Sequence, residues 1–411
     1  MDRPQSSQKA AVQPSDSYVY LDYAATAPLC EEAKAAMEPF LEAGRPATTT
    51  YMNPNSLSAP GRNAFKALED ARRSIAASLD AGRPDQIVLT SGATEADNAG
   101  ILCVALGLQR ERDRSGKGAK GHVITSSIEH DAVLATAKRL ELLGFDVTYI
   151  DPDRDGFVEV RKLEEALRPD TLLVSIQMAN SEVGSIQPIE QLAKTAHDAG
   201  ALFHTDATQA LGKTELSLSR LGVDAASLSS HKVGGPKGVG ALYLKSKTPF
   251  LPLVMGGGQE AGRRSGTQNV AGAVGFAAAC AAAVESMESE RDRLSAIRDR
   301  LYADLASFDC IDATVDMEEG SLDYLPNIVN FMFAGIESMT AVIRFDALGF
   351  AVSGGSACSS SSLEPSHVLT SMGIRADEAQ GEVRVSMGRY TTREDVNAFL
   401  RAVPNVIDWK R

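Results

Sequence analysis

Cysteine is scarce and scattered in this 411-residue sequence, which contains Cys30, Cys103, Cys280, Cys310 and Cys358 and no Cys-x-x-Cys pair. An odd number of widely separated thiols argues against a disulfide framework and against a closed zinc site, so no metal is expected. A reducing, cytoplasmic setting fits this cysteine usage. Four of the cysteines are expected to be plain structural residues, since Cys103 and Cys280, for example, lie in apolar stretches of helical pattern.

Long hydrophobic runs and an excess of positive charge are also lacking. No apolar run approaches the ~20 residues that a membrane-spanning helix needs. The first 17 residues are polar, contain one arginine and lack the apolar core of a signal peptide, so we expect residues 1–17 to form a disordered tail. The chain has 41 Lys and Arg against 54 Asp and Glu, a net charge of −13, which argues against nucleic acid or an anionic membrane as a partner.

The length and the hydrophobic pattern indicate a two-domain α/β protein. Single hydrophobic cores stop growing at roughly 250–300 residues, so 411 residues suggest two domains. Short apolar, β-branched runs such as residues 86–90 and 171–176 alternate with longer helical patterns such as residues 131–143. This alternation predicts a mostly parallel sheet covered on both faces. We expect a large domain over residues 18–270, whose first residues pack on a small C-terminal domain over residues 271–411.

The most informative segment is Ser-Ser-His-Lys-Val-Gly-Gly-Pro-Lys-Gly at residues 229–238. A lysine that forms a Schiff base must be neutral to attack an aldehyde, so it needs a desolvated or cation-rich site that lowers its pKa. A solvated surface lysine is the alternative for Lys232. The flanking His231 and the glycine-rich turn favour the Schiff-base role.

Asp206 ends an apolar, strand-like run, Phe-His-Thr-Asp-Ala-Thr-Gln at residues 203–209. A buried carboxylate without a partner is unfavourable, so Asp206 should have a cationic partner such as a protonated pyridine nitrogen. The alternative is that Asp206 caps the next helix.

Cys358 differs from the other cysteines because its neighbours are small and polar, in the run Val-Ser-Gly-Gly-Ser-Ala-Cys-Ser-Ser-Ser-Ser-Leu-Glu-Pro. Such neighbours favour an exposed, mobile loop, which a thiol needs if it must first attack a sulfur atom and then deliver it. An inert buried thiol is a poor alternative in a segment this polar.

Two glycine-containing segments are candidates for phosphate binding. Residues 89–95 (Leu-Thr-Ser-Gly-Ala-Thr-Glu) combine a strand end, a glycine turn and a helix start, where backbone N–H groups can bind an anion. Ordinary helix capping is the alternative. The second segment has glycines at residues 256–258 and Arg-Ser-Gly-Thr at residues 264–267. Neither contains a Walker motif.

Two further side chains suit substrate chemistry. His130 follows a predicted strand and could shuttle protons, although a capping or surface role is the commoner one for such a histidine. Arg384 lies on a probable strand, and its planar guanidinium suits a substrate α-carboxylate. A salt bridge at the surface or at an interface is the alternative for Arg384.

Together these motifs resemble those of the cysteine desulfurases, in particular the branch whose cysteine loop reads GSACxSxSLEPS. The resemblance runs from about residue 19 to about residue 392 and includes at least seven motifs in the family's order. It implies a fold-type-I pyridoxal-phosphate enzyme with a mostly parallel, seven-stranded sheet. The implied reaction converts L-cysteine to L-alanine and transfers the sulfur to an enzyme cysteine as a persulfide. The sulfur would then pass to an acceptor protein, an iron–sulfur scaffold or a sulfur carrier, and the iron–sulfur, thio-cofactor, tRNA and specialised pathways all stay open.

The resemblance also implies roles for individual residues. Lys232, Cys358 and His130 would be catalytic, with His130 stacked on the pyridine ring, and Arg384 would bind the substrate. In a homodimer, Thr267 would reach the phosphate in the neighbouring subunit. The remaining residues implied in cofactor binding are Ala93, Thr94, Asp206, Gln209 near the ring oxygen, Ser229 and His231.

The chain departs from the family's pattern at two places. Asn180-Ser181-Glu182 replaces the usual Asn-Asn-Glu, so either Asn180 or Ser181 would have to supply the ring contact. Ser58 stands where many members have histidine.

Two other functions remain as alternatives. Selenocysteine lyase or an aminotransferase-like reaction is the alternative among enzymes, but an aminotransferase would not need Cys358. A non-catalytic sulfur-transfer scaffold is an alternative of another class, and the intact Lys232 and Asp206 argue against it.

Overall fold

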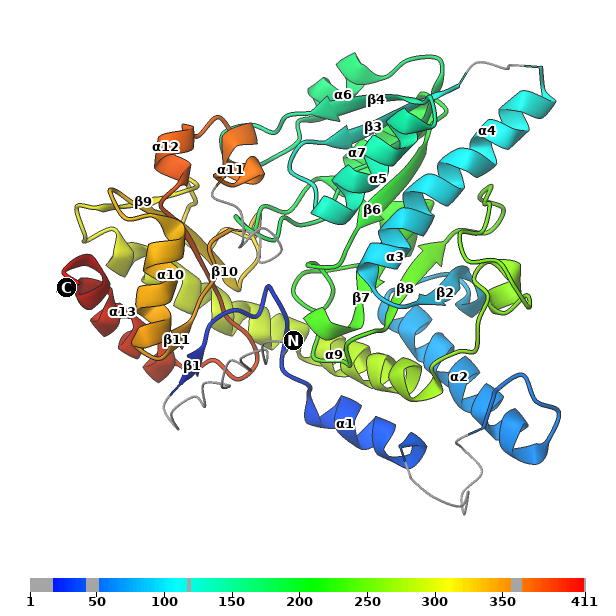
Figure 1. Ribbon diagram of the computed structural model, residues 1–411, viewed down its shortest axis with the longest axis horizontal. Coiled ribbons are helices and arrows are strands. Elements are labelled where there is room, and N and C mark those ends of the chain that lie inside the picture. Colours follow the sequence, from blue (N-terminus) through cyan, green and yellow to red (C-terminus); the bar gives the residue numbers. More distant parts are fainter. Residues whose placement is uncertain (1–17, 42–51, 117–119, 356–363, 410–411) are drawn as a thin grey trace, which may run out of the picture.

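A seven-stranded sheet forms the centre of the larger half of the molecule in the computed structural model (Figure 1), which describes residues 18–41, 52–116, 120–355 and 364–409. The strand order is β2-β8-β7-β6-β5-β3-β4. β8 runs antiparallel to both of its neighbours, and the other neighbouring pairs are parallel. The predicted α/β fold with a mostly parallel sheet is therefore confirmed. The strands are β2 (Ile87–Thr90), β3 (His122–Ser126), β4 (Asp146–Ile150), β5 (Thr171–Ser175), β6 (Leu202–Asp206), β7 (Ala225–Ser229) and β8 (Gly240–Leu244).

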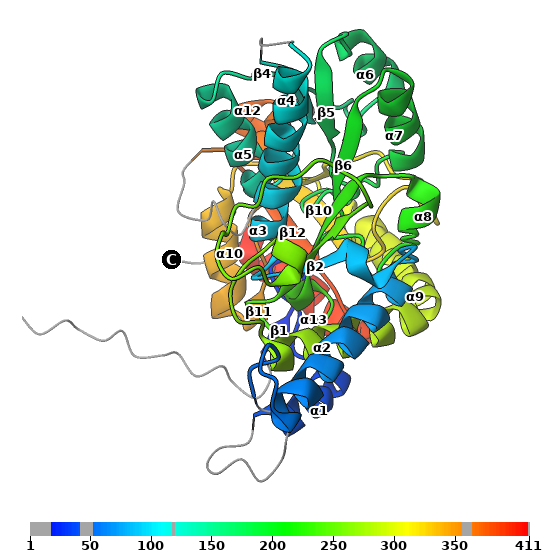
Figure 2. The same ribbon diagram turned by 90° about the vertical axis from the view of Figure 1, so that its right-hand side faces the viewer.

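Helices cover both faces of this sheet, so its strands are almost continuously buried, as expected for parallel strands with helices on either side. Figure 2 shows α4 and α5 on one side of β5 and β6, and α6 and α7 on the other. The helices of this half are α1 (Glu31–Met37), η1 (Glu38–Phe40), α2 (Ala59–Ser78), η2 (Pro84–Gln86), α3 (Ala93–Asn98), η3 (Ala99–Cys103), α4 (Val104–Arg114), α5 (Asp131–Leu142), α6 (Val160–Ala166), α7 (Ile189–Asp198), α8 (Leu218–Leu221), η4 (Ser230–Lys232) and η5 (Glu260–Gly262).

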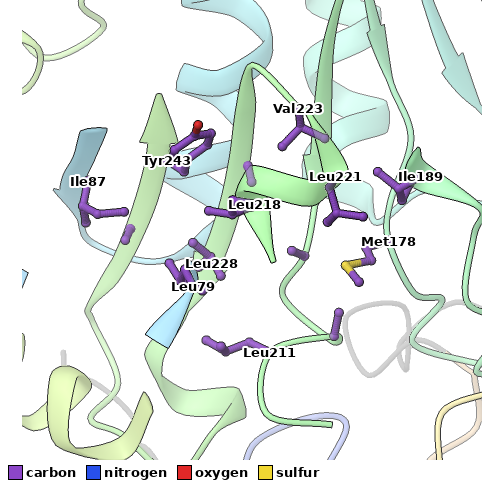
Figure 3. Close-up of a cluster of buried hydrophobic side chains, with 14 of the residues drawn as sticks. Leu79, Ile87, Met178, Ile189, Leu211, Leu218, Leu221, Val223, Leu228 and Tyr243 are labelled. Carbon is purple, nitrogen blue, oxygen red and sulfur yellow. The ribbon is translucent and has the colours of Figure 1, made fainter. Parts of the chain in front are cut away.

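A hydrophobic cluster lies between the sheet and the helices of one face (Figure 3). Leu218 and Leu221 of α8 pack there with Leu228 of β7, and all three are buried. Leu211, in the segment between β6 and α8, is also fully buried in this cluster. Burying one leucine side chain contributes roughly 1.5–3 kcal/mol to folding stability. The buried Leu211 therefore fixes the position of the next residues, Gly212 and Lys213.

The smaller half has its own sheet and its own cluster. Its three-stranded antiparallel sheet has the order β12-β10-β9, and the short strands β1 and β11 pair in parallel beside it. Leu21 directly follows β1 and is fully buried in this cluster, so the first described residues pack on the C-terminal part of the chain. The elements are β1 (Val19–Tyr20), β9 (Ile311–Ala313), β10 (Ile328–Phe333), α10 (Ser338–Ala347), β11 (Phe350–Ala351), α11 (His367–Ser371), α12 (Ala376–Ala379), β12 (Glu382–Ser386) and α13 (Arg393–Ile407).

The 36-residue helix α9 (Val270–Leu305) joins the two halves (Figure 1). Its first turns, including Phe276 and Cys280, belong to the first cluster, and its last turns, including Leu301, belong to the second. By length and composition α9 could cross a membrane, which the sequence pattern did not suggest. The long core helix of a water-soluble protein passes the same test, and α9 packs against α1 and α2 at one end and β10 at the other.

Candidate active site

A cavity of about 470 Å³ opens where several strands of the large sheet end. Asp206 and Ser229 are the last residues of β6 and β7, and Gln177 and His130 follow β5 and β3. In open α/β sheets, ligands bind at the carboxyl ends of the strands. Of the residues singled out in the sequence, those that line this cavity are Ala93, Thr94, His130, Ser181, Asp206, Gln209, Ser229, His231, Lys232 and Arg384. Cys358 lies outside the described residues.

Lys232 is positioned by η4, the short helix that follows β7. Its Nζ donates hydrogen bonds to the carbonyl oxygens of Ala24 (2.5 Å) and Ala25 (2.9 Å), which belong to the N-terminal segment that crosses between the two halves. Lys232 is half-buried and lines the cavity, so it is not the solvated surface lysine of the alternative interpretation.

The surroundings of Lys232 are rich in positive charge. Burial, together with the charges of Lys232, Lys237 and Lys213, lowers the pKa of His231 to about 4. The ring of His231 is therefore neutral near pH 7, and its Nδ1 lies 3.1 Å from Oγ1 of Thr26. The lysine thus has the cation-rich site that the sequence predicted.

Asp206 stabilises a turn and also lines the cavity. Its Oδ1 accepts a hydrogen bond from the backbone N–H of Thr208 (2.9 Å), so it stabilises the turn after β6, yet the carboxylate still lines the cavity. Two more buried carboxyl groups act on this end of the cavity. Burial, and then the charge of Asp206, raises the pKa of Asp97 well above its usual range. Burial is also the main reason that the pKa of Glu129 is raised to about 8.

The polar atoms of the cavity fit pyridoxal phosphate. Within the described residues, both carboxylate oxygens of Asp97 and Oγ1 of Thr208 are buried without a hydrogen-bond partner, and both residues line the cavity. Buried polar atoms without partners are rare in native proteins, so the acidic end of the cavity calls for a proton or a cationic ligand group. A protonated pyridine nitrogen meets this need, and the phosphate suits the cationic wall around Lys232.

The start of α3 offers a place for the phosphate. Gly92 precedes the helix with φ 155° and ψ 178°, a conformation that is nearly exclusive to glycine. α3, η3 and α4 follow one another without a break, so the first N–H groups belong to one long helical segment and have no partners within it. Glu95 in the first turn is held by Arg264 (2.8 Å) and by the backbone N–H of Ser91 (2.8 Å), so its charge is already compensated.

His130 caps a helix and faces the cavity at the same time. Its Nδ1 accepts a hydrogen bond from the backbone N–H of Ala132 (3.1 Å) at the start of α5. A ring nitrogen that accepts from an amide carries no proton, so the neutral ring has its proton on Nε2. His130 therefore brings a single N–H donor to this site.

Asn180 and Ser181 are the two candidates for the contact that the family's Asn-Asn-Glu motif makes with the ring. Of these two residues, only Ser181 lines the cavity. Asn180 is buried, and its Nδ2 donates to the carbonyl oxygen of Ile128 (3.1 Å). Its Oδ1 accepts from the backbone N–H groups of Glu182 (2.8 Å) and Val183 (2.9 Å). The amide of Asn180 thus stabilises the local turn, and of the two residues Ser181 is the one at the cavity.

Arg384 lies on β12 and reaches the cavity from the smaller half. Its Nη2 donates to Oδ1 of Asp22 (2.9 Å), and its Nη1 donates to the carbonyl oxygen of Ser181 (2.9 Å). The salt bridge of the alternative interpretation therefore exists, but the guanidinium is buried. Within the described residues its buried Nε has no hydrogen-bond partner, and the residue lines the cavity.

Thr267 does not line the cavity of its own chain and is exposed. The segment before it is firmly anchored, because Glu260 forms a bidentate ion pair with the buried Arg72 (2.6 and 2.9 Å) and accepts from the backbone N–H of Leu89 (3.0 Å). Met255, in the same loop, is 82% exposed. This loop therefore turns away from its own active site.

Several residues of the site had not been singled out in the sequence. Asp97 lies three residues after Thr94 on the same helical run, and Lys213 lies four residues after Gln209. Helical spacing from Thr94 could have suggested Asp97. The spacing of four residues from Gln209 could likewise have suggested Lys213. The carbonyl groups of Ala24 and Ala25 offered no comparable signal, because their contacts to Lys232 arise only in the folded chain.

Comparisons with known proteins extend over nearly the whole chain. Residues 19–399 match the aminotransferase class-V family. The cysteine desulfurase IscS of Dictyoglomus turgidum is 44% identical over 390 residues, which cover 95% of this chain and 94% of the relative. The cysteine desulfurase IscS 1 of Archaeoglobus fulgidus is 40% identical over 394 residues, which cover 95% of this chain and 97% of the relative.

Solved structures show the same similarity in three dimensions. A NifS-like protein superposes with a TM-score of 0.85 and 35% identity, over 96% of this chain and 100% of that protein. A structure of SspA in complex with cysteine superposes with a TM-score of 0.74 and 36% identity, over 91% of this chain and 100% of SspA.

Proposed function

This chain belongs to the aminotransferase class-V family and is a pyridoxal-phosphate-dependent cysteine desulfurase, and we propose that Lys232 holds the cofactor and Cys358 receives the sulfur. The single observation that supports these roles best is that Lys232, Asp206 and Arg384 line one cavity although they come from three separate parts of the sequence. A lysine, a buried carboxylate and a buried guanidinium are what an amino acid and a pyridine cofactor need for binding.

When bound, pyridoxal phosphate supplies an aldehyde that joins to amines and a ring that withdraws the electron pair released from a substrate Cα–H bond. Asp206 holds the positive charge of the ring nitrogen, and Gln209 binds the ring oxygen. The phosphate is bound by the start of α3 and by further polar groups that line the cavity, namely Ala93, Thr94, Ser229 and His231.

The chain's own groups bind the substrate and move its protons. Arg384, which lines the cavity, binds the α-carboxylate of L-cysteine with its guanidinium. Nζ of Lys232 would take the proton from Cα of the substrate as a general base and would return a proton to Cα before L-alanine leaves. His130 offers its Nε2–H as a donor beside the ring, and Ser181 offers a hydroxyl where most relatives would have an amide.

The sulfur transfer step uses Cys358, which lies outside the described residues. Its thiolate attacks the sulfur of the substrate, so an S–S bond forms while the Cβ–S bond breaks. The electron pair of the broken bond stays on Cβ, which takes up a proton and becomes the methyl group of L-alanine. The sulfur is oxidised to the persulfide level and the carbon is reduced, so no external oxidant or reductant is needed.

The proposed substrate is supported by the solved complex of SspA with cysteine, a protein that is 36% identical to this chain. The names of the relatives do not distinguish between sulfur acceptors, and we propose an iron–sulfur scaffold or a sulfur carrier protein as the acceptor. We further propose a cytoplasmic location, because the described cysteines are free thiols.

We also propose a homodimer in which Thr267 of each subunit completes the phosphate site of the other. Thr267 is exposed and does not line the cavity of its own chain. The exposed side chains of Leu253, Val254 and Met255 in the same loop offer an apolar contact surface for a second subunit. Thr267→Val should weaken cofactor retention without removing the lysine attachment. A fully active protein that sediments as a monomer at micromolar concentration would contradict the shared site.

The experiment that tests the function is incubation of the purified protein with pyridoxal phosphate and L-cysteine, followed by measurement of L-alanine and of protein-bound persulfide. Cys358→Ser should retain the cofactor and still alter its absorbance when cysteine binds, but should form no persulfide. Alanine production at the wild-type rate in this variant would contradict the role of Cys358. Faster turnover of selenocysteine than of cysteine would instead favour a selenocysteine lyase.

A further inference from the structure

A chain of hydrogen bonds links a second lysine, Lys213, to Lys232. Nζ of Lys213 donates to Oε1 of Gln209 (2.7 Å). Nε2 of Gln209 donates to the carbonyl oxygen of Ala24 (3.0 Å), and the same carbonyl accepts from Nζ of Lys232 (2.5 Å). Gln209 lines the cofactor cavity, whereas Lys213 lies behind it, where it lines two neighbouring cavities.

The two ends of this chain determine which way the amide of Gln209 points. The carbonyl of Ala24 can only accept, so it requires the NH₂ group. The protonated amine of Lys213 can only donate, so it requires the amide oxygen. With Oε1 occupied by Lys213 and one N–H occupied by Ala24, the hydrogen-bonding atom that remains for a ligand in the cavity is the second N–H of Gln209.

Lys213 is held at this position by its surroundings. Leu211, two residues earlier, is buried in the cluster of Figure 3. Gly212 has φ +69°, and a Cβ atom there would come within 2.6 Å of Ala283 on α9, so the chain passes close to this helix. Among the described residues no carboxylate lies within ion-pair distance of Lys213, so Gln209 is its principal side-chain partner. Burial, and then the charges of Lys232 and Arg384, lowers the pKa of Lys213 to about 7.

We propose that Lys213 is a positioning residue of the desulfurase, which locks the amide of Gln209 so that it presents a donor, and not an acceptor, to the ring oxygen of pyridoxal phosphate. This inference rests on the proposed binding of the ring oxygen by Gln209. Without Lys213, only the carbonyl of Ala24 opposes rotation of the Gln209 amide, so a larger fraction of molecules has Oε1 directed at the ring oxygen. In that orientation two oxygen acceptors face each other, and the ionised form of the ring oxygen loses its partner.

The test uses 4-deoxypyridoxine 5′-phosphate, which lacks the aldehyde and therefore cannot join to Lys232. Its ultraviolet absorbance reports ionisation of the ring oxygen in the bound state. Lys213→Met should raise the dissociation constant of this analogue about tenfold, the effect of losing one hydrogen bond to an ionised group. It should also raise the pH at which the bound ring oxygen ionises, because a donor stabilises the ionised form. Lys213→Arg keeps a donor and should restore both values to near those of the wild type.

A double-mutant cycle separates positioning from a direct effect of the positive charge. If Lys213 acts through Gln209, Gln209→Leu and the double variant with Lys213→Met should bind the analogue equally weakly. Lys194→Met is the matched control, since Lys194 is an exposed lysine that pairs with Asp198 on α7, and it should leave binding unchanged.

Three results would overturn the proposal: wild-type affinity and titration in Lys213→Met, failure of Lys213→Arg to restore them, or effects of the two single variants that simply multiply in the double variant. These readouts do not depend on turnover. A wild-type protein that binds the analogue but makes no alanine from cysteine would contradict the proposed function and leave the positioning role intact.

Discussion

Two groups of ionisable residues at the cavity differ in charge, and we call them the cationic wall and the acidic wall. In each group, bringing like charges together in a buried place is unfavourable. One wall brings Lys232, His231 and Arg384 together with Lys213 behind them, and in it the pKa values of His231 and Lys213 fall to about 4 and about 7. The acidic wall contains Asp206 and Asp97, which line the cavity, and the buried Glu129 lies behind the lining, where the charge of Asp206 acts on it. There, burial and mutual repulsion raise the pKa of Glu129 to about 8 and that of Asp97 well above its usual range.

The comparison shows how a fold can select a ligand with separated charges. Like charges that are buried together disfavour one another, and an opposite charge on the ligand relieves them. Pyridoxal phosphate has a phosphate for one wall and a protonatable ring nitrogen for the other. Perturbed groups that cluster in a cleft are typical of functional sites. The cofactor should therefore stabilise the folded protein strongly.

The largest effect is expected from removing the reactive group of the cationic wall. Lys232→Ala should abolish covalent attachment of the cofactor and alanine production, because Lys232 lines the cavity from η4, directly after β7, whereas Lys237, which also lines the cavity, lies further along the connection to β8. Absorbance of the purified variant and an alanine assay provide the measurement. If the variant still showed the absorbance of covalently attached cofactor and still turned over cysteine, another lysine would hold the cofactor. Lys237→Ala is the matched control, and it should keep the attached cofactor.

A paired substitution in the acidic wall should give the next largest effect. Asp206→Asn removes the negative charge next to the ring nitrogen and should lower kcat by about a hundred- to a thousandfold. Asp97→Asn should have a much smaller effect on kcat, because burial and the charge of Asp206 raise the pKa of Asp97 well above its usual range and so disfavour its charged form. Equal losses in the two variants would show that the charge of Asp206 has no special role beside the ring nitrogen.

Glu129 allows the acidic wall to be tested through stability. Its pKa is raised from 4.5 to about 8 in the folded protein, so between these values the folded state binds more protons than the unfolded state. Stability from this group is therefore lost as the pH rises through that window, with a slope of at most about 1.4 kcal/mol per pH unit. Glu129→Gln should remove this slope. The melting temperature of the variant minus that of the wild type should therefore be larger at pH 8 than at pH 5. A difference in melting temperature that does not change with pH would show that Glu129 ionises normally.

The smallest effect is expected where the chain departs from the pattern of its family. Ser181→Asn should change kcat/KM by less than about threefold, because the contact of Ser181 with Arg384 uses the backbone carbonyl and not the side chain. Steady-state kinetics and a cofactor titration measure this. A large loss of activity with unchanged folding would indicate that the cavity is built around the smaller serine.

Much of the site was predictable because its main residues sit in local motifs. Lys232 lies between a histidine and a glycine-rich turn, and Asp206 ends an apolar strand, so hydrophobic pattern and neighbouring residues were enough to single them out. The mostly parallel sheet followed from the alternation of short apolar runs and helical patterns, and it is confirmed. Asn180 was harder, since its sequence neighbours do not reveal that its amide is used up by the turn.

The sequence by itself therefore determined the fold class and the chemistry of each strand end, because these depend on residues a few positions apart. Only the tertiary structure decided which groups meet. Lys232 reaches Ala24 across 208 positions, Gln209 reaches Ala24 across 185, and Arg384 reaches Asp22 across 362. Such contacts have no local signature, because they arise when β1 pairs with β11 and draws the segment after it past the cavity. The charges of each wall and the shifted pKa values follow from that packing.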